Sequence, residues 1–203
     1  MNASAPHPSR RQFVLLLAIF LLPLLAAYLW YFLFPHQRPE RTVNYGELVQ
    51  PARPLPALTL RDGAGQPVAA DVFKSQWTLL YLAPVDCDAA CQQRVFLSRQ
   101  VRTALDKDSR RVQRVYLAPD ATALARARAA LAAQQTDLIW LVDAGEPGHR
   151  ASDFFGAQPA DALELIDPLG NWMMVYPPHD PPQQDFKGML KDLKLLLRLS
   201  HIG

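Results

Sequence analysis

The feature that most constrains this chain is an apolar run near its N-terminus, Phe13–Phe34. The run holds 22 residues without a charge and is interrupted only by Pro23. A helix rises 1.5 Å per residue, so the run would extend about 33 Å, enough to cross a hydrocarbon core of about 30 Å. We therefore predict a transmembrane anchor at 13–34, preceded by a cytoplasmic tail, residues 1–12.

A cleaved signal peptide is the alternative to an anchor, because Arg10 and Arg11 precede the run. Signal-peptide apolar stretches are shorter, about 7–15 residues, and end at small residues. This run ends in an aromatic cluster, Tyr28–Phe34, which suits a membrane interface. A long domain that follows an anchor is translocated largely regardless of charge. We expect an uncleaved single-pass anchor in a bacterial-type inner (cytoplasmic) membrane, with the domain facing the periplasm or the outside.

The chain beyond the anchor divides into a spacer and one domain. Residues 35–56 contain five prolines among polar residues, a composition that favours an extended linker. Residues 57–203, roughly 150 residues, are enough for one domain with its own core. The net charge of +2 is spread over interspersed acids and bases, so we expect no nucleic-acid partner.

The hydrophobic pattern of 57–203 alternates between strands and helices. Continuous apolar runs predict strands buried on both faces, and helical spacing of apolar residues predicts the helices between them. The predicted strands cover 57–61, 78–83, 112–118, 138–142, 163–166 and 172–176, and the predicted helices 88–106, 121–133 and 185–199. Parallel strands with helical crossovers, then an antiparallel hairpin and a closing helix, predict an α/β domain with a thioredoxin-like fold.

The chain's two cysteines, Cys87 and Cys91, lie where a predicted strand passes into a predicted helix. Free N–H groups at a helix start favour a thiolate, whereas the neighbouring charges of Asp86 and Asp88 disfavour it. One helical turn separates the cysteines, so both sulfurs face the same side. This spacing permits a redox pair, two ligands to a soft metal ion, or a structural disulfide.

The domain resembles the Sco/SenC family at three places. These are the Cys87/Cys91 pair on its loop, the strand 112–119 and the turn 165–170, Leu-Ile-Asp-Pro-Leu-Gly. The cysteine spacing is the specific element of the three. The resemblance implies a membrane-anchored protein with a thioredoxin fold that assists assembly of the copper centre of cytochrome c oxidase. It also implies copper on the two cysteines and a distant histidine. Cu(I) prefers thiolate ligands and tolerates low coordination, so we expect any bound copper to be Cu(I).

The sequence departs from that family at the histidine. The matching stretch, 157–161, reads Ala-Gln-Pro-Ala-Asp, with Pro159 near the ligand position. The three-ligand copper site therefore does not carry over. His149 and His179 are the remaining candidates for a third ligand, and a surface loop residue is the plainer interpretation of each.

Three hypotheses follow for the function. The first, which we favour, is a Sco-like accessory protein that acts through its thiol pair on a cytochrome c oxidase subunit or on other assembly factors. It would be an assembly factor or a copper and thiol chaperone more than a turnover enzyme. The others are a thiol–disulfide oxidoreductase, which the three-residue spacing disfavours, and a non-catalytic interaction module with the same fold.

Overall fold

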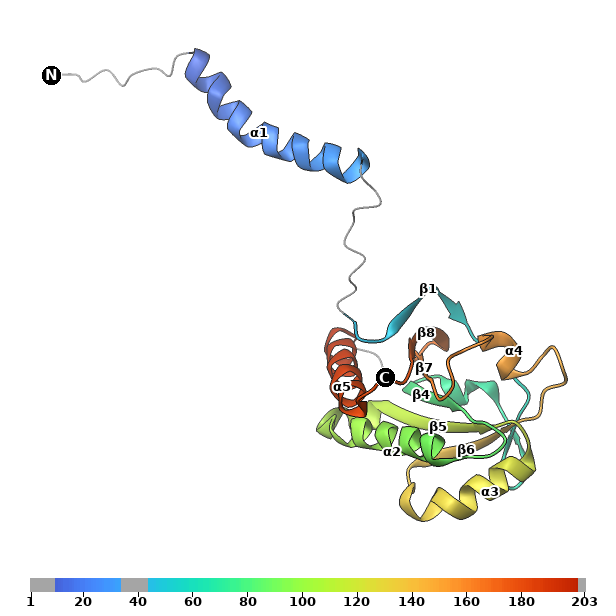
Figure 1. Ribbon diagram of the computed structural model, residues 1–203. Helices are drawn as coiled ribbons and strands as arrows, with labels where there is room; N and C mark the ends of the chain where they lie inside the picture. Colours follow the sequence, from blue (N-terminus) through green and yellow to red (C-terminus); the bar gives the residue numbers. More distant parts are fainter. Residues whose placement is uncertain (1–9, 34–43, 201–203) are drawn as a thin grey trace. The chain divides into compact units, whose positions relative to one another are not determined.

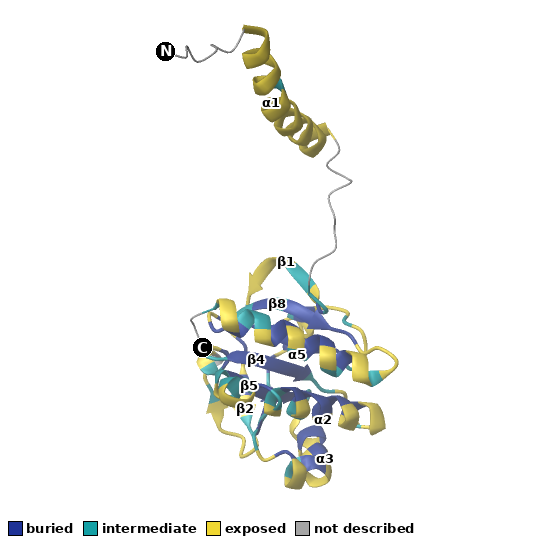
Figure 2. Ribbon diagram, turned by 90° about the vertical axis from the view of Figure 1, so that its left-hand side faces the viewer, coloured by how far each residue is buried: buried dark blue, intermediate teal, exposed yellow. Residues whose placement is uncertain are grey.

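The computed structural model describes residues 10–33 and 44–200 (Figure 1). The chain separates into two units, Met1–Val43 and Asn44–Gly203. In the first unit, helix α1 (Arg10–Leu33) contains residues 13–33 of the predicted apolar run, passes through Pro23 and buries none of its side chains (Figure 2). It is long and apolar enough to cross a membrane. Phe34 and residues 1–9 of the predicted tail lie outside the described residues.

The second unit is built on an eight-stranded sheet in the order β1-β8-β7-β4-β5-β6-β2-β3. Strands β4, β5 and β6 are parallel, and the other neighbouring pairs are antiparallel. The strands are β1 (Glu47–Pro54), β2 (Leu60–Asp62), β3 (Pro67–Val68), β4 (Trp77–Leu82), β5 (Val112–Ala118), β6 (Leu138–Asp143), β7 (Leu163–Ile166) and β8 (Asn171–Tyr176). A parallel centre that continues into an antiparallel hairpin confirms the predicted thioredoxin-like fold.

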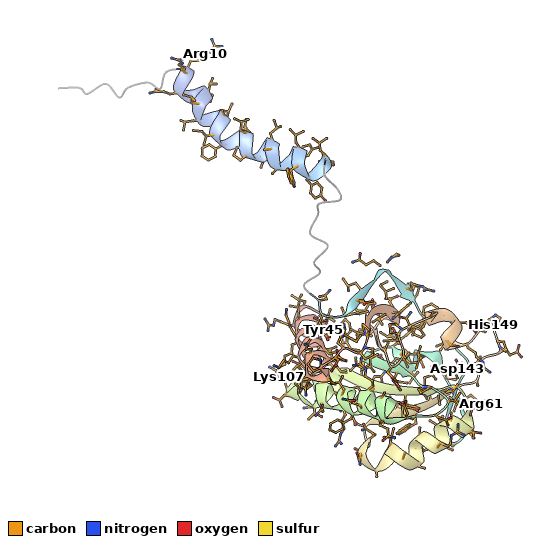
Figure 3. The ribbon with its side chains drawn as sticks, viewed as in Figure 1. Arg10, Tyr45, Arg61, Lys107, Asp143 and His149 are labelled. Carbon is orange, nitrogen blue, oxygen red and sulfur yellow. A yellow bond between two sulfur atoms is a disulfide. The ribbon has the colours of Figure 1, made fainter. Side chains whose placement is uncertain are left out.

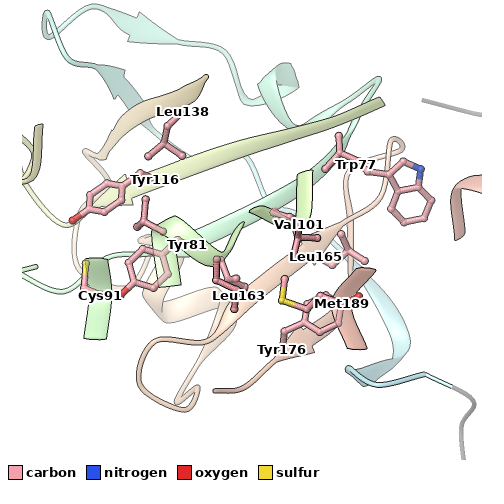
Figure 4. Close-up of a cluster of buried hydrophobic side chains, with 14 of the residues drawn as sticks. Trp77, Tyr81, Cys91, Val101, Tyr116, Leu138, Leu163, Leu165, Tyr176 and Met189 are labelled. Atoms are coloured by element: carbon pink, nitrogen blue, oxygen red, sulfur yellow. The ribbon is translucent and has the colours of Figure 1, made fainter. Parts of the chain in front are cut away.

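Helices cover both faces of this sheet. Residues of α2 (Ala89–Thr103), α3 (Ala121–Leu131) and α5 (Pro182–Leu199) enter one core cluster, part of which is drawn in Figure 4. Residues of α4 (Ala151–Phe155) and of the 3-10 helix η2 (Ala70–Phe73) enter a second cluster on the other face. Leu79 and Tyr81 of β4 belong to the first cluster and Leu80 to the second. This alternation explains why the strand reads as a continuous apolar run.

The domain begins earlier than the predicted spacer allows. Residues 44–56 belong to the second unit, and β1 pairs with β8 at one edge of the sheet. The N–H groups of Tyr45 and Gly46 both donate to the buried Asp192 carboxylate of α5. The prediction of a spacer through residue 56 is therefore wrong for 44–56, because an edge strand tolerates proline. Residues 35–43 lie outside the described residues.

Most other predicted elements lie within a few residues of their expected positions. Helix α3 begins after Asp120, whose carboxylate accepts a hydrogen bond from the N–H of Ala123, as its sequence predicts. Helix α2 ends at Thr103, and the 3-10 helix η3 (Asp106–Arg111) follows it, so the prediction of a helix to residue 106 is too long. Strand β3, α4, η2, η3 and the 3-10 helix η4 (Ala132–Gln134) were not predicted.

Glu164 is a carboxyl group inside the sheet. It lies on β7 opposite Leu80 of β4 and Val175 of β8, and it is 1% exposed. Its Oε2 accepts a hydrogen bond from Nε1 of Trp172 at 2.7 Å. Burial raises the pKa of Glu164 to about 8, although the bond from Trp172 acts in the opposite direction. Glu164 is therefore mainly protonated in the folded protein at neutral pH.

We expect this burial to make stability depend on pH. Between its ordinary pKa of 4.5 and about 8, the folded protein keeps a proton that the unfolded chain has lost. The free energy of unfolding should then fall by up to about 1.4 kcal/mol per pH unit as the pH rises through this window. Glu164→Gln can still accept the hydrogen bond from Trp172 but has no proton to lose. Its free energy of unfolding, measured by urea denaturation, should therefore change less with pH than that of the wild type.

The exposed Glu146 supplies the matched control. Glu146→Gln removes a carboxyl group from a solvated loop and should leave the descending profile unchanged. Parallel profiles for the wild-type chain and Glu164→Gln between pH 5 and pH 8 would contradict the prediction.

Candidate functional site

The two cysteines lie where β4 passes into α2. Strand β4 ends at Leu82, and α2 begins at Ala89. Asp88 caps the helix, because its carboxylate accepts a hydrogen bond from the N–H of Cys91 at 3.0 Å. The prediction that both cysteines lie at the start of the first long helix of the domain is confirmed.

Cys87 and Cys91 form a disulfide, with their Cα atoms 5.2 Å apart. Cys87 is half-buried in the loop, whereas Cys91 is 0% exposed. Figure 4 shows Cys91 beside Tyr81, and Tyr116 belongs to the same core cluster. A nucleophile from solvent therefore has access to Cys87, whereas the protein core shields Cys91 from solvent.

A pocket of about 450 Å³ lies beside the cysteine loop, residues 83–88 between β4 and α2. Its lining comes from the loop between β4 and α2, through Pro84, Asp86 and Asp88. The segment before β7 contributes residues 156 and 158–162, and β7 itself contributes Glu164. The stretch 157–161, where the resemblance would place a histidine, thus lies close to the cysteine loop. Within that stretch Pro159 lines the pocket near the expected ligand position, and Asp161 lines it as well.

The structure does not bring the candidate histidines to the cysteine pair. His149 is exposed in the loop between β6 and α4, at the outer edge of the domain (Figure 3). Nδ1 of His179 lies 3.0 Å from the Tyr45 hydroxyl and 3.0 Å from Oδ1 of Asp185. Across residues 10–33 and 44–200, no three Cys, His, Asp or Glu side chains are grouped so that they could hold a metal ion.

Arg94, next to the disulfide, carries a buried charge that the sequence pattern did not predict. It lies one turn after Cys91 and donates to the carbonyl oxygens of Asp161 and Tyr176 and to Oδ2 of Asp185. Burial lowers the pKa of Arg94, and the adjacent Asp185 carboxylate opposes this effect. Arginine in a helix usually suggests a solvated face. The spacing of 91, 94, 95, 98 and 101 along one helical face was the signal that it points inward.

Comparison with known proteins identifies the domain. Residues 77–200 match the family model described as "Transmembrane-like, thioredoxin-like, C-terminal domain". No curated protein matches the chain.

Several solved structures share the fold at low sequence identity. Yeast Sco1 is 14% identical with a TM-score of 0.59, and the match covers 75% of this chain and 98% of that one. Copper-bound ScoI of Arabidopsis thaliana is 16% identical with a TM-score of 0.53, covering 69% and 98%. Apo Sco1 of Thermus thermophilus is 17% identical with a TM-score of 0.52, covering 78% and 99%.

The family model spans β4 to β8, the loop that carries Cys87, α2 and α5, which is more than half of the chain. The chain belongs to the family of transmembrane-like, thioredoxin-like C-terminal domains.

Proposed function

We propose that this chain is a membrane-tethered thiol–disulfide protein that assists assembly of the copper centre of cytochrome c oxidase. The observation that carries the proposal is the Cys87–Cys91 disulfide at the start of α2, in which Cys87 is half-buried and Cys91 fully buried. The sequence resemblance to the Sco/SenC family suggests the process in which the disulfide acts, the assembly of cytochrome c oxidase. Solved Sco proteins with the same fold, one of them with copper bound, support this choice.

The unequal burial of the two sulfurs fits the two steps of disulfide exchange. In the reduced chain, the Cys87 thiolate attacks a disulfide of the partner and forms a mixed disulfide, and one partner sulfur leaves as a thiolate. The Cys91 thiolate then attacks the Cys87 sulfur and releases the second partner thiolate. Two electrons pass from the chain to the partner, and the chain ends in the disulfide form seen here. An external thiol reductant returns it to the dithiol.

The anchor fits a partner that is itself in the membrane. Helix α1 is long enough to span a bilayer, and disulfides persist in oxidising compartments. We place the domain on the periplasmic or outer side of a bacterial-type cytoplasmic membrane. There it would meet a cytochrome c oxidase subunit or another assembly factor.

Copper enters this proposal as cargo of the reduced form. Cu(I) prefers thiolate ligands and tolerates low coordination, and the two cysteines are close enough to share one ion. Neither His149 nor His179 is grouped with the pair in the structure. We therefore propose a two-sulfur Cu(I) site, which the disulfide form lacks because its sulfurs are bonded to each other.

The cysteines should differ in their reaction with a disulfide probe. With the full chain reduced in detergent and treated with glutathione disulfide, Cys91→Ser should accumulate a mixed disulfide at Cys87. Cys87→Ser should react at least about tenfold more slowly, because Cys91 is buried in the core. Intact-protein mass spectrometry measures the adduct, and no other cysteine in the chain can contribute to it. Equal rates for the two variants, or no adduct on either, would support the interaction module instead.

Copper retention should depend on both sulfurs and on neither histidine. In an anaerobic Cu(I) titration of the reduced chain against a chelator of known affinity, Cys87→Ser or Cys91→Ser should each remove most of the binding, because one sulfur cannot chelate. His149→Ala and His179→Ala are the matched controls and should bind like the wild type. A large loss in one of them would identify it as a third ligand and overturn the two-sulfur site.

A further inference from the structure

Two carboxylates flank Cys87 in the sequence, and both have partners in the fold. Uncompensated charges on Asp86 and Asp88 would disfavour a thiolate between them. The Asp88 carboxylate is directed to the N–H of Cys91 at the start of α2, so it is engaged as the cap of that helix. Asp86 is paired from a different part of the chain.

Arg126 of α3 reaches across to the cysteine loop. Its Nη2 lies 2.9 Å from Oδ1 of Asp86 and donates a hydrogen bond to the carbonyl oxygen of Val85 at 3.0 Å. One guanidinium thus holds the two residues that immediately precede Cys87. The side chains are 50% and 81% exposed for Arg126 and Asp86, so this is a surface pair placed beside a reactive sulfur.

We propose that Arg126 is a positioning residue for the thiol–disulfide reaction: it fixes the loop that presents Cys87 and neutralises Asp86 beside the sulfur. The proposal rests on the proposed function, because it concerns the reactivity of the same thiol. Its electrostatic part concerns the reduced form, in which a thiolate at Cys87 would otherwise face an unpaired carboxylate.

The other ionisable groups around the loop already have partners within the fold. Asp161 accepts a hydrogen bond from the Tyr81 hydroxyl, Glu164 accepts one from Trp172, and Arg94 pairs with Asp185. They remain the same in every variant compared below. A change in Cys87 reactivity on removal of Arg126 can then be assigned to the Asp86 pair and the loop that it holds.

The experiment measures alkylation of Cys87 by iodoacetamide as a function of pH. It uses the full reduced chain with Cys91→Ser, so that Cys87 is the only thiol. Arg126→Ala should move the midpoint of the pH profile upward by about 0.3–0.7 pH units, the range for an exposed ion pair. The difference should shrink in 1 M salt, where the Debye length is about 3 Å. Alanine is a good helix former, so α3 should persist.

Three variants separate a local effect from a general one. Arg128→Ala removes the same charge from the same helix, but its guanidinium lies against Gly63, so the midpoint should stay at the wild-type value. Arg126→Lys keeps the positive charge, so the midpoint of its pH profile should lie between those of Arg126→Ala and the wild type. In an Asp86→Asn background, Arg126→Ala should have less than half of its effect, because no carboxylate remains to be neutralised.

The outcomes distinguish this proposal from the function on which it rests. A reactive Cys87 whose pH profile is the same in Arg126→Ala and Arg128→Ala would overturn the role of Arg126 and leave the thiol function standing. An equal effect of Arg126→Ala with and without Asp86 would overturn the electrostatic part. A Cys87 that does not react in the wild-type background at any pH would overturn both proposals.

Discussion

The buried guanidinium of Arg94 joins the segments that surround the disulfide. It lies on α2 one turn after Cys91 and bonds to the Asp161 and Tyr176 carbonyl oxygens and to Asp185 of α5. Asp185 in turn accepts from the Tyr45 hydroxyl, so the first residues of the domain join the same network. A buried charge of this kind is costly to leave unpaired, and loss of one partner typically costs about 3–5 kcal/mol. The position of the cysteine helix on the sheet therefore depends on polar contacts as well as on apolar packing.

This network also explains the close fit at the N-terminal edge of the domain. The ring of Tyr45 occupies the space where a side chain at position 188 of α5 would lie, which is why glycine stands there. The N–H of Tyr45 bonds to Asp192, one turn further along the same helix. Segment 44–46 is thus fixed by side chains of α5 before β1 begins. The N-terminal end of the domain is therefore attached to α5 close to the point where its described residues begin.

The sequence predicted those parts of the fold that depend on local patterns. Continuous apolar runs identify β4 and β6, the Asp120 cap identifies α3, and the strand-to-helix junction places both cysteines. It did not predict features that depend on distant partners. β1 reads as a spacer because its prolines are acceptable only when β8 pairs with it at a sheet edge, and Arg94 reads as a surface residue because Asp185 lies 91 positions away. The pairing of Asp86 with Arg126 depends on how α3 packs, which local sequence does not encode.

The departure at 157–161 bears on how a copper role and a redox role relate to each other. Pro159 and Asp161 of this segment line the pocket beside the loop that carries Cys87. Formation of the disulfide removes both thiolates as metal ligands. Among the described residues, no group of three Cys, His, Asp or Glu side chains could hold a metal ion in their place. Oxidation and Cu(I) binding would then use the same electrons on the same two atoms and exclude each other. In the proposed two-sulfur site, the thiol state would therefore decide whether the protein carries copper.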